Sequence, residues 1–169
     1  MTRTTEIRAR WACAAVLAGG MLAAVAMAAP APEAFWSLVG ELAAAAPQGG
    51  KAVVHKWPGR PLAQAGAAGI GSAPFAVEPG LQTAIAEVRL ADDDAVQLMV
   101  LELQGRCITP ADLGARYRKV TNADFPQPDN PDPVRYRRVQ IDGVRVSFGF
   151  RGAAPGCLSH VVFNPRAAD

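Results

Sequence analysis

The segment RYRRVQIDGVRVSFGFR, residues 135–151, carries the clearest fold signal in the chain. Asp142-Gly143 is a preferred two-residue hairpin turn, and β-branched or aromatic residues alternate with polar ones on both sides of it. The pattern predicts antiparallel strands over 135–141 and 144–151. One face then carries Val139, Ile141, Val144, Val146, Phe148 and Phe150. The other carries Tyr136, Arg138, Gln140, Arg145, Ser147 and Gly149. On that second face we expect Arg138 and Arg145 to lie directly opposite each other.

Neighbouring segments extend this hairpin into a sheet. Residues 81–90 and 95–103 are rich in Val, Leu and Ile and flank the acidic turn 91–94, which predicts a second hairpin. Residues 157–163 predict a last strand. The stretch 95–101 is apolar on nearly both faces, so we expect it to be a central strand.

Two segments have helical signals. Pro32-Glu33 suits a first helical turn, and an apolar stripe at helical spacing follows and ends before Pro47. That stripe consists of Phe35, Leu38, Val39 and Leu42. Thr109-Pro110-Ala111-Asp112 combines a capping residue, a proline at the first helical position and an acid at the third. This motif predicts a second, short helix.

These elements predict an α+β fold: an antiparallel sheet with two helices packed on one face. Two α-β-β-β halves, 32–103 and 107–163, are a candidate organisation. The element order over Pro32–Phe163 is similar to that of small periplasmic modules with a helical layer on an antiparallel sheet. The β-lactamase inhibitor protein and the small lipoprotein of the β-barrel assembly machine are examples of such modules.

Two segments have weaker patterns. Residues 51–57, KAVVHKW, favour a short strand. Residues 58–80 are rich in Gly, Ala and Pro without any period, so we expect a long flexible loop.

The N-terminal 28 residues are typical of a cleavable signal peptide. Arg3, Arg8 and Arg10 precede an uncharged Ala-rich run, which closes on Ala26-Met27-Ala28. A retained membrane anchor is the alternative, but the run is only weakly lipophilic. We therefore expect a single exported domain, residues 29–169, located in the periplasm and without a stable membrane anchor.

Removal of residues 1–28 changes the charge of the chain. Three arginines and Glu6 leave with it, so the formal net charge falls from +2 to 0. The basic character of the whole chain thus gives no support for nucleic-acid binding. Charge is unevenly distributed along residues 29–169, because residues 29–105 have a net charge of −4 and residues 106–169 a net charge of +4.

Two cysteines, Cys107 and Cys157, remain after cleavage. An even pair in an oxidising compartment predicts one disulfide. Cys157 and His160 have a metal-type spacing, but on a strand residues three apart face opposite sides, so we expect no metal site. No C-x-x-C motif supports a redox role.

Catalytic and cofactor motifs are absent from the sequence. No G-x-S-x-G, S-x-x-K, phosphate loop or dinucleotide fingerprint occurs, and we expect no cofactor. Ser159 and His160 are adjacent, which on a regular strand places them on opposite faces. A periplasmic hydrolase with a Ser/His site remains the alternative function.

The leading hypothesis is a non-catalytic periplasmic binding protein. Its candidate binding residues are Tyr136, Arg138 and Arg145, because an Arg-Tyr surface suits carboxylate or phosphate groups. The partner would be another envelope protein or an anionic ligand. An inhibitor or immunity-type protein and an envelope assembly factor are two forms of this hypothesis.

Overall fold

The computed structural model describes residues 32–59, 61–62, 69–123, 133–152 and 156–166. They belong to one compact unit, Ala31–Asp169. The predicted signal peptide lies outside the described residues. None of the helices in the described part has the length and apolar character needed to span a bilayer.

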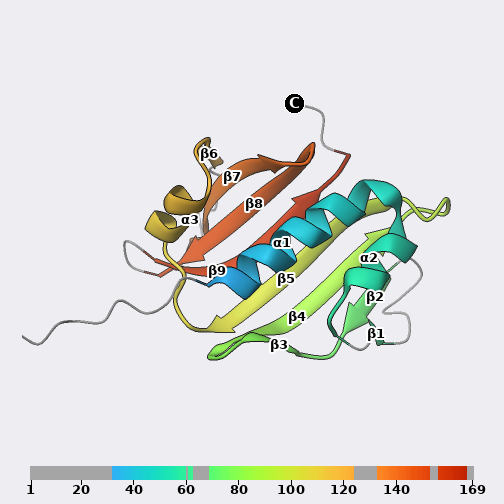
Figure 1. The fold of residues 1–169 in the computed structure, drawn as a ribbon, viewed down its shortest axis with the longest axis horizontal. Coiled ribbons are helices and arrows are strands. Elements are labelled where there is room, and N and C mark those ends of the chain that lie inside the picture. The colour runs from blue at the N-terminus through green and yellow to red at the C-terminus, as the bar shows by residue number, and fades with distance from the viewer. Residues whose placement is uncertain (1–31, 60, 63–68, 124–132, 153–155, 167–169) are drawn as a thin grey trace, which may run out of the picture. The chain divides into compact units, whose positions relative to one another are not determined.

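The fold is α+β, as predicted, and it is built on one antiparallel sheet (Figure 1). The strand order is β1-β2-β4-β5-β9-β8-β7-β6, and β3 pairs with β4 beside this path. The strands are β1 (Pro61–Leu62), β2 (Gly69–Ser72), β3 (Ala76–Glu78), β4 (Leu81–Leu90), β5 (Val96–Gly105), β6 (Thr121–Ala123), β7 (Arg135–Ile141), β8 (Val144–Arg151) and β9 (Cys157–Asn164). Pairing of β5 with β9 joins the two hairpins into a single layer.

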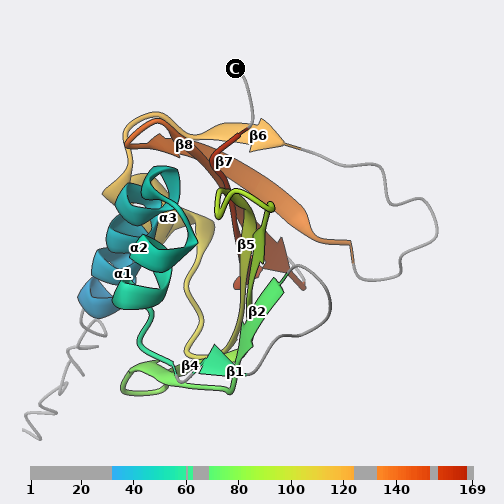
Figure 2. The ribbon, with the colours of Figure 1, turned by 90° about the vertical axis from the view of Figure 1, so that its right-hand side faces the viewer.

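The helices lie on one side of this sheet (Figure 2). They are α1 (Glu33–Ala45), the 3₁₀ turn η1 (Ala46–Gln48), α2 (Gly50–Lys56) and α3 (Pro110–Arg116). The predicted capping box of α3 is confirmed: Asp112 N donates to Thr109 Oγ1, and Thr109 N donates to Asp112 Oδ2 at 2.8 Å. Among the described residues, the first half has two α-helices and five strands, and the second has one α-helix and four strands. The suggested α-β-β-β halves are therefore wrong.

The prediction of a strand over 51–57 is also wrong, because α2 occupies most of this segment. The N–H groups of Gly50 and Lys51, at the start of the helix, both donate to Asp94 in the β4–β5 turn. Gly50 lies so close to that turn that a Cβ would come within 2.7 Å of the Asp94 carboxylate. A partner more than forty residues away therefore satisfies the helix start, and no local pattern reveals it.

The segment 58–80 contains β1, β2 and β3, so the prediction of a loop throughout is wrong. The edge of β4 holds β2 by antiparallel pairing, with Ile70 opposite Val88. Small residues in β2 hide the alternation that marks a strand, and its order comes from backbone pairing with β4. Residues 60 and 63–68 lie outside the described residues.

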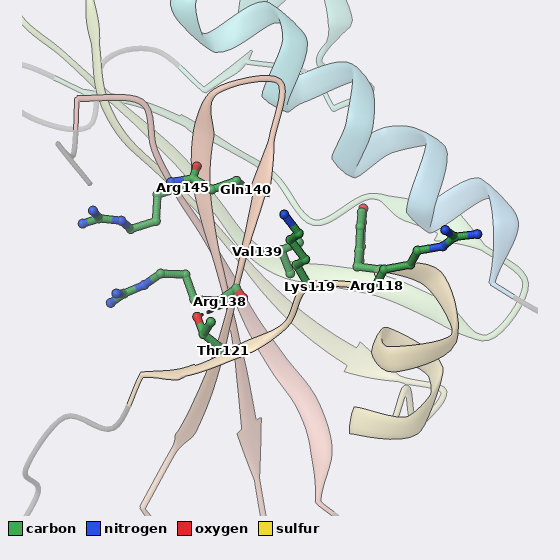
Figure 3. Close-up of a pocket in the computed structure, with 8 residues that line it drawn as sticks. Arg118, Lys119, Thr121, Arg138, Val139, Gln140 and Arg145 are labelled. Atoms are coloured by element: carbon green, nitrogen blue, oxygen red, sulfur yellow. Dashed lines mark hydrogen bonds between the residues drawn. The ribbon is translucent and has the colours of Figure 1, made fainter.

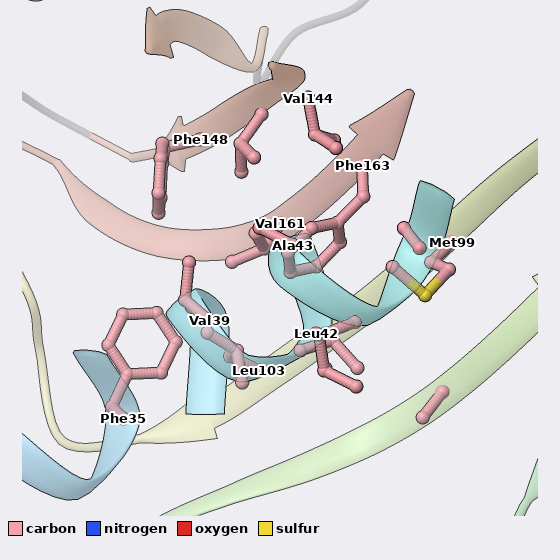
Figure 4. Close-up of a cluster of buried hydrophobic side chains, with 14 of the residues drawn as sticks. Phe35, Val39, Leu42, Ala43, Met99, Leu103, Val144, Phe148, Val161 and Phe163 are labelled. Carbon is pink, nitrogen blue, oxygen red and sulfur yellow. The ribbon is translucent and has the colours of Figure 1, made fainter. Parts of the chain in front are cut away.

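The core lies between α1 and the middle of the sheet (Figure 4). Three of the four predicted stripe residues of α1 are buried, and Leu38 is half-buried against the same cluster. Their neighbours in the sheet include Met99 and Leu103 of β5, Val144 and Phe148 of β8, and Val161 and Phe163 of β9.

The predicted disulfide is present and ties the start of α3 to the start of β9. Cys107 and Cys157 are joined with a Cα–Cα distance of 5.0 Å. Next to it, Leu158 N donates to Ile108 O at 2.8 Å. The bridge therefore connects the segment before α3 to the sheet.

Candidate functional site: the open face of the sheet

The side of the sheet opposite the helices carries the candidate binding residues. We call it the open face, because no helix in the described part of the chain lies on it (Figure 2). Strand pairing arranges its side chains in rows across β4, β5, β9, β8 and β7. The middle row is Glu87, Val100, Val162, Ser147 and Arg138. An adjacent row is Ile85, Glu102, His160, Gly149 and Tyr136.

The centre of the open face is apolar. Val100 pairs with Val162 between β5 and β9, and both are half-buried. Ile85, in β4, is 50% exposed and is the one large hydrophobic side chain that is exposed in the described part of the chain. The face therefore combines apolar area with charged side chains at its margins.

The β7–β8 hairpin has the predicted strands and the predicted turn, with Ile141 opposite Val144. This register, however, places Arg138 opposite Ser147 and Arg145 opposite Gln140. The prediction that the two arginines lie directly opposite each other is wrong. In a two-residue hairpin the residue numbers of every directly opposite pair have the same sum. The sum for Arg138 and Arg145 is smaller by two, so these residues cannot lie directly opposite each other. The arginines are diagonal neighbours, so their repulsion is weaker than that of a direct pair.

Arg138 and Arg145 nevertheless share the open face. Their side chains extend side by side from the hairpin, away from Arg118 and Lys119 (Figure 3). The Nε of Arg138 is buried and has no hydrogen-bond partner among the described residues. Paired guanidinium groups in this orientation suit carboxylate oxygens, which accept two parallel hydrogen bonds from each arginine.

Tyr136, the third predicted residue, lies over Gly149 of the neighbouring strand. A Cβ at Gly149 would approach Tyr136 Cε1 to 2.9 Å, so glycine makes room for the ring. Burial raises the pKa of Tyr136, although Arg151 opposes the shift. The phenol therefore stays neutral and provides a hydroxyl and a flat apolar surface.

A groove of about 500 Å³ lies at the β7 edge of this hairpin. It is lined by Tyr117, Arg118, Lys119, Thr121, Arg138, Val139, Gln140 and Arg145. Sequence reasoning missed Arg118 and Lys119, which reach the hairpin because β6 pairs with β7, with Thr121 opposite Arg138. The basic run Arg116-Tyr117-Arg118-Lys119 was the available signal. Arginine and lysine side chains thus flank the groove from two sides.

A second polar cluster involves Ser159, His160 and Glu102. Ser159 Oγ lies 2.8 Å from His160 Nδ1, so the prediction that their side chains face opposite sides is wrong. The pairing register of β8 and β9 shifts between Gly149 and Phe150, which leaves Ser159 as an extra residue of a β-bulge. His160 Nε2 lies 3.8 Å from Glu102 Oε1 across the β5–β9 pair.

The proton positions in this cluster bear on catalysis. The Ser159 hydroxyl donates to the carbonyl oxygen of Gly149 at 3.2 Å. The same hydroxyl lies 2.8 Å from His160 Nδ1, and the tautomer of the ring decides which of these two atoms donates. A catalytic base must accept the proton of the nucleophile. The Nδ1 tautomer therefore separates a structural network from an activated serine.

His160 gives the protein a pH-dependent stability. Burial lowers the pKa of His160 below its ordinary value of 6.5, Glu102 opposes this, and Arg151 lowers it further. The unfolded chain then binds a proton more readily than the folded chain, so the free energy of unfolding falls as pH drops below about 6.5. We expect His160→Gln to flatten this dependence between about pH 7 and about pH 5, as measured by urea unfolding. If the stability of His160→Gln depends on pH as that of the wild type does, another titrating group causes the dependence.

The described residues contain no group of three or more His, Cys, Asp or Glu side chains arranged to hold a metal ion. In comparisons with known proteins, no family model, curated protein or solved structure matches this chain. The functional argument therefore depends on the geometry of the open face.

Proposed function

We propose that this protein is an exported, non-catalytic binding protein of the periplasm, and that its open face contacts a protein that presents carboxylates. The observation that carries the proposal is the pair Arg138 and Arg145, which extend side by side on a sheet face without a helix over it in the described part of the chain. Inhibition of an envelope enzyme and assistance in envelope assembly are both compatible with such a surface.

Export is supported by two features of different kinds. Residues 1–28 have the order of a secretory signal: basic start, apolar run and Ala-x-Ala end. The disulfide between Cys107 and Cys157 fits the same compartment, because disulfides persist in oxidising environments and are rare in the cytosol.

The binding proposal can be tested by affinity capture with matched charge variants. Arg138→Glu/Arg145→Glu should lose a partner that the wild type retains, because each contact changes from attraction to repulsion. Lys51→Glu/Lys56→Glu makes the same change of charge on α2, on the helix side, and should retain that partner. Quantitative mass spectrometry compares the captured proteins. If the arginine variant captures the same proteins at the same level, the open face is not the contact surface.

A hydrolase is the second candidate, favoured by the 2.8 Å contact between Ser159 and His160 with Glu102 near the other ring nitrogen. A fluorophosphonate probe distinguishes it from the binding proposal. Labelling of the wild type, and none of Ser159→Ala, would support hydrolysis. If the probe does not label the wild type, the hydrolase hypothesis is rejected.

A further inference from the structure

We propose that the partner of the open face is a second copy of this chain, which forms a two-fold dimer by packing sheet against sheet. This inference depends on the proposed use of the open face for binding. It follows from the distribution of charge and apolar area over the five strands that build the face.

The strand order determines what a two-fold axis would bring together. Across the open face the order is β4-β5-β9-β8-β7, with β9 in the middle. An axis that runs along β9, between the two copies, exchanges β4 with β7 and β5 with β8. Packed sheets keep their strand directions within about 30° of each other, which is compatible with such an axis.

This axis places complementary residues opposite each other in the middle row. Glu87 of β4 lies over Arg138 of β7 in the second copy, and Val162 lies over its own counterpart. Glu87 is at present bonded to Arg89 at 2.8 Å, an exposed pair that contributes little.

The adjacent row provides the apolar contact. Ile85 lies over Tyr136 of the second copy, and by symmetry this contact occurs twice. The exposed Ile85 side chain would then pack against the phenol ring that lies on Gly149. An aliphatic side chain on an aromatic ring is a favourable interface pair.

The charges also select this orientation over the other face-to-face arrangement. An axis across the strands would place β7 over β7 and β4 over β4. Arg138 would then face Arg138 and Glu87 would face Glu87, so like charges would repel. Of these two axes, the one along β9 is the one that places Glu87 opposite Arg138.

The size of the face sets the expected affinity. Five strands at about 4.8 Å spacing and three rows at about 6.8 Å cover about 500 Å² in each copy. The total of about 1,000 Å² is at the lower end for specific protein interfaces. We therefore expect a weak, micromolar dimer that populates at high concentration.

Analytical ultracentrifugation of the purified protein without residues 1–28 tests the dimer. Between about 10 μM and about 500 μM the mean mass should rise from monomer toward dimer. Arg138→Glu and Glu87→Arg should each weaken self-association at least 10-fold, because each converts both symmetry-related contacts into repulsive ones. Lys51→Glu, on the helix side, is the matched control and should associate like the wild type.

Mixing the two variants gives the decisive measurement. A mixed dimer has two symmetry-related contacts between positions 87 and 138. One of them is the wild-type pair, Glu87 with Arg138, and in the other the two charges are exchanged, so both contacts are attractive. Each variant alone should be monomeric, and the equimolar mixture should form dimers with an affinity within 10-fold of the wild type. Circular dichroism of each variant confirms that it is folded.

Three results would overturn the inference: a wild type that stays monomeric to about 500 μM, a dimer insensitive to both variants, or a mixture that stays monomeric. Failure of the dimer is distinguishable from failure of the proposed function. If the protein is monomeric but Arg138→Glu/Arg145→Glu still loses a captured protein, the face binds a different partner.

Discussion

Replacement of Phe148 by alanine is expected to lower the free energy of unfolding by about 3–5 kcal/mol. Phe148 is 0% exposed, and its ring centroid lies 6.0 Å from that of Trp36 in α1 and 6.1 Å from that of Tyr117, just after α3. On β8 it pairs with Val161 of β9. The side chain thus joins both helical segments to the centre of the sheet, and its removal leaves a cavity with several walls.

Urea unfolding monitored by circular dichroism measures this loss. Phe148→Leu keeps most of the volume and should cost less than about 1.5 kcal/mol. Ile85→Ala, at a half-exposed position outside the core, should change the stability by less than about 0.5 kcal/mol. All three should be measured at low micromolar concentration, where self-association does not contribute. A loss below about 1.5 kcal/mol for Phe148→Ala would show that the site collapses around the missing ring.

Loss of the disulfide is expected to have a similar effect. Cys107 and Cys157 are 50 residues apart in sequence, and closing a loop of that length restricts the unfolded chain. The chain-entropy model assigns about 4 kcal/mol to this restriction. Cys107→Ser/Cys157→Ser should therefore lower the free energy of unfolding by about that amount while the folded structure persists.

Unfolding of the oxidised wild type, the reduced wild type and the double variant separates the bridge from the substitution. Both cysteine positions are exposed, so serine should be tolerated in the fold. Reduced wild type and double variant should have the same stability. A difference between oxidised and reduced protein below about 1 kcal/mol would contradict the loop-closure explanation.

Local signals predicted the elements whose cause is local. The turn at Asp142-Gly143 sets the register of β7 and β8, and the box from Thr109 to Asp112 sets the start of α3. Elements that depend on distant partners were missed. The start of α2 requires Asp94, and β2 requires the edge of β4.

Local patterns likewise predicted one part of the candidate site, and distant strand pairing determined the other part. Alternation along the hairpin was enough to place Tyr136, Arg138 and Arg145 on one face. Pairing of β6 with β7 brought Arg118 and Lys119 to the edge of that hairpin, and a bulge turned Ser159 toward His160. Neither the β6–β7 pairing nor the bulge at Ser159 can be predicted reliably from the residues next to it in the sequence.

The sequence by itself determined the two hairpins, α1, α3, the cysteine pair and the polar face of residues 135–151. Period, turn chemistry and capping act over a few residues, so they can be read directly from the chain. Only the tertiary structure decided that β5 pairs with β9, that every described helix lies on one side, and that Glu87 and Arg138 lie in one row at opposite margins of the open face. Those features depend on how distant segments bury apolar area together, and that choice is made by the whole fold.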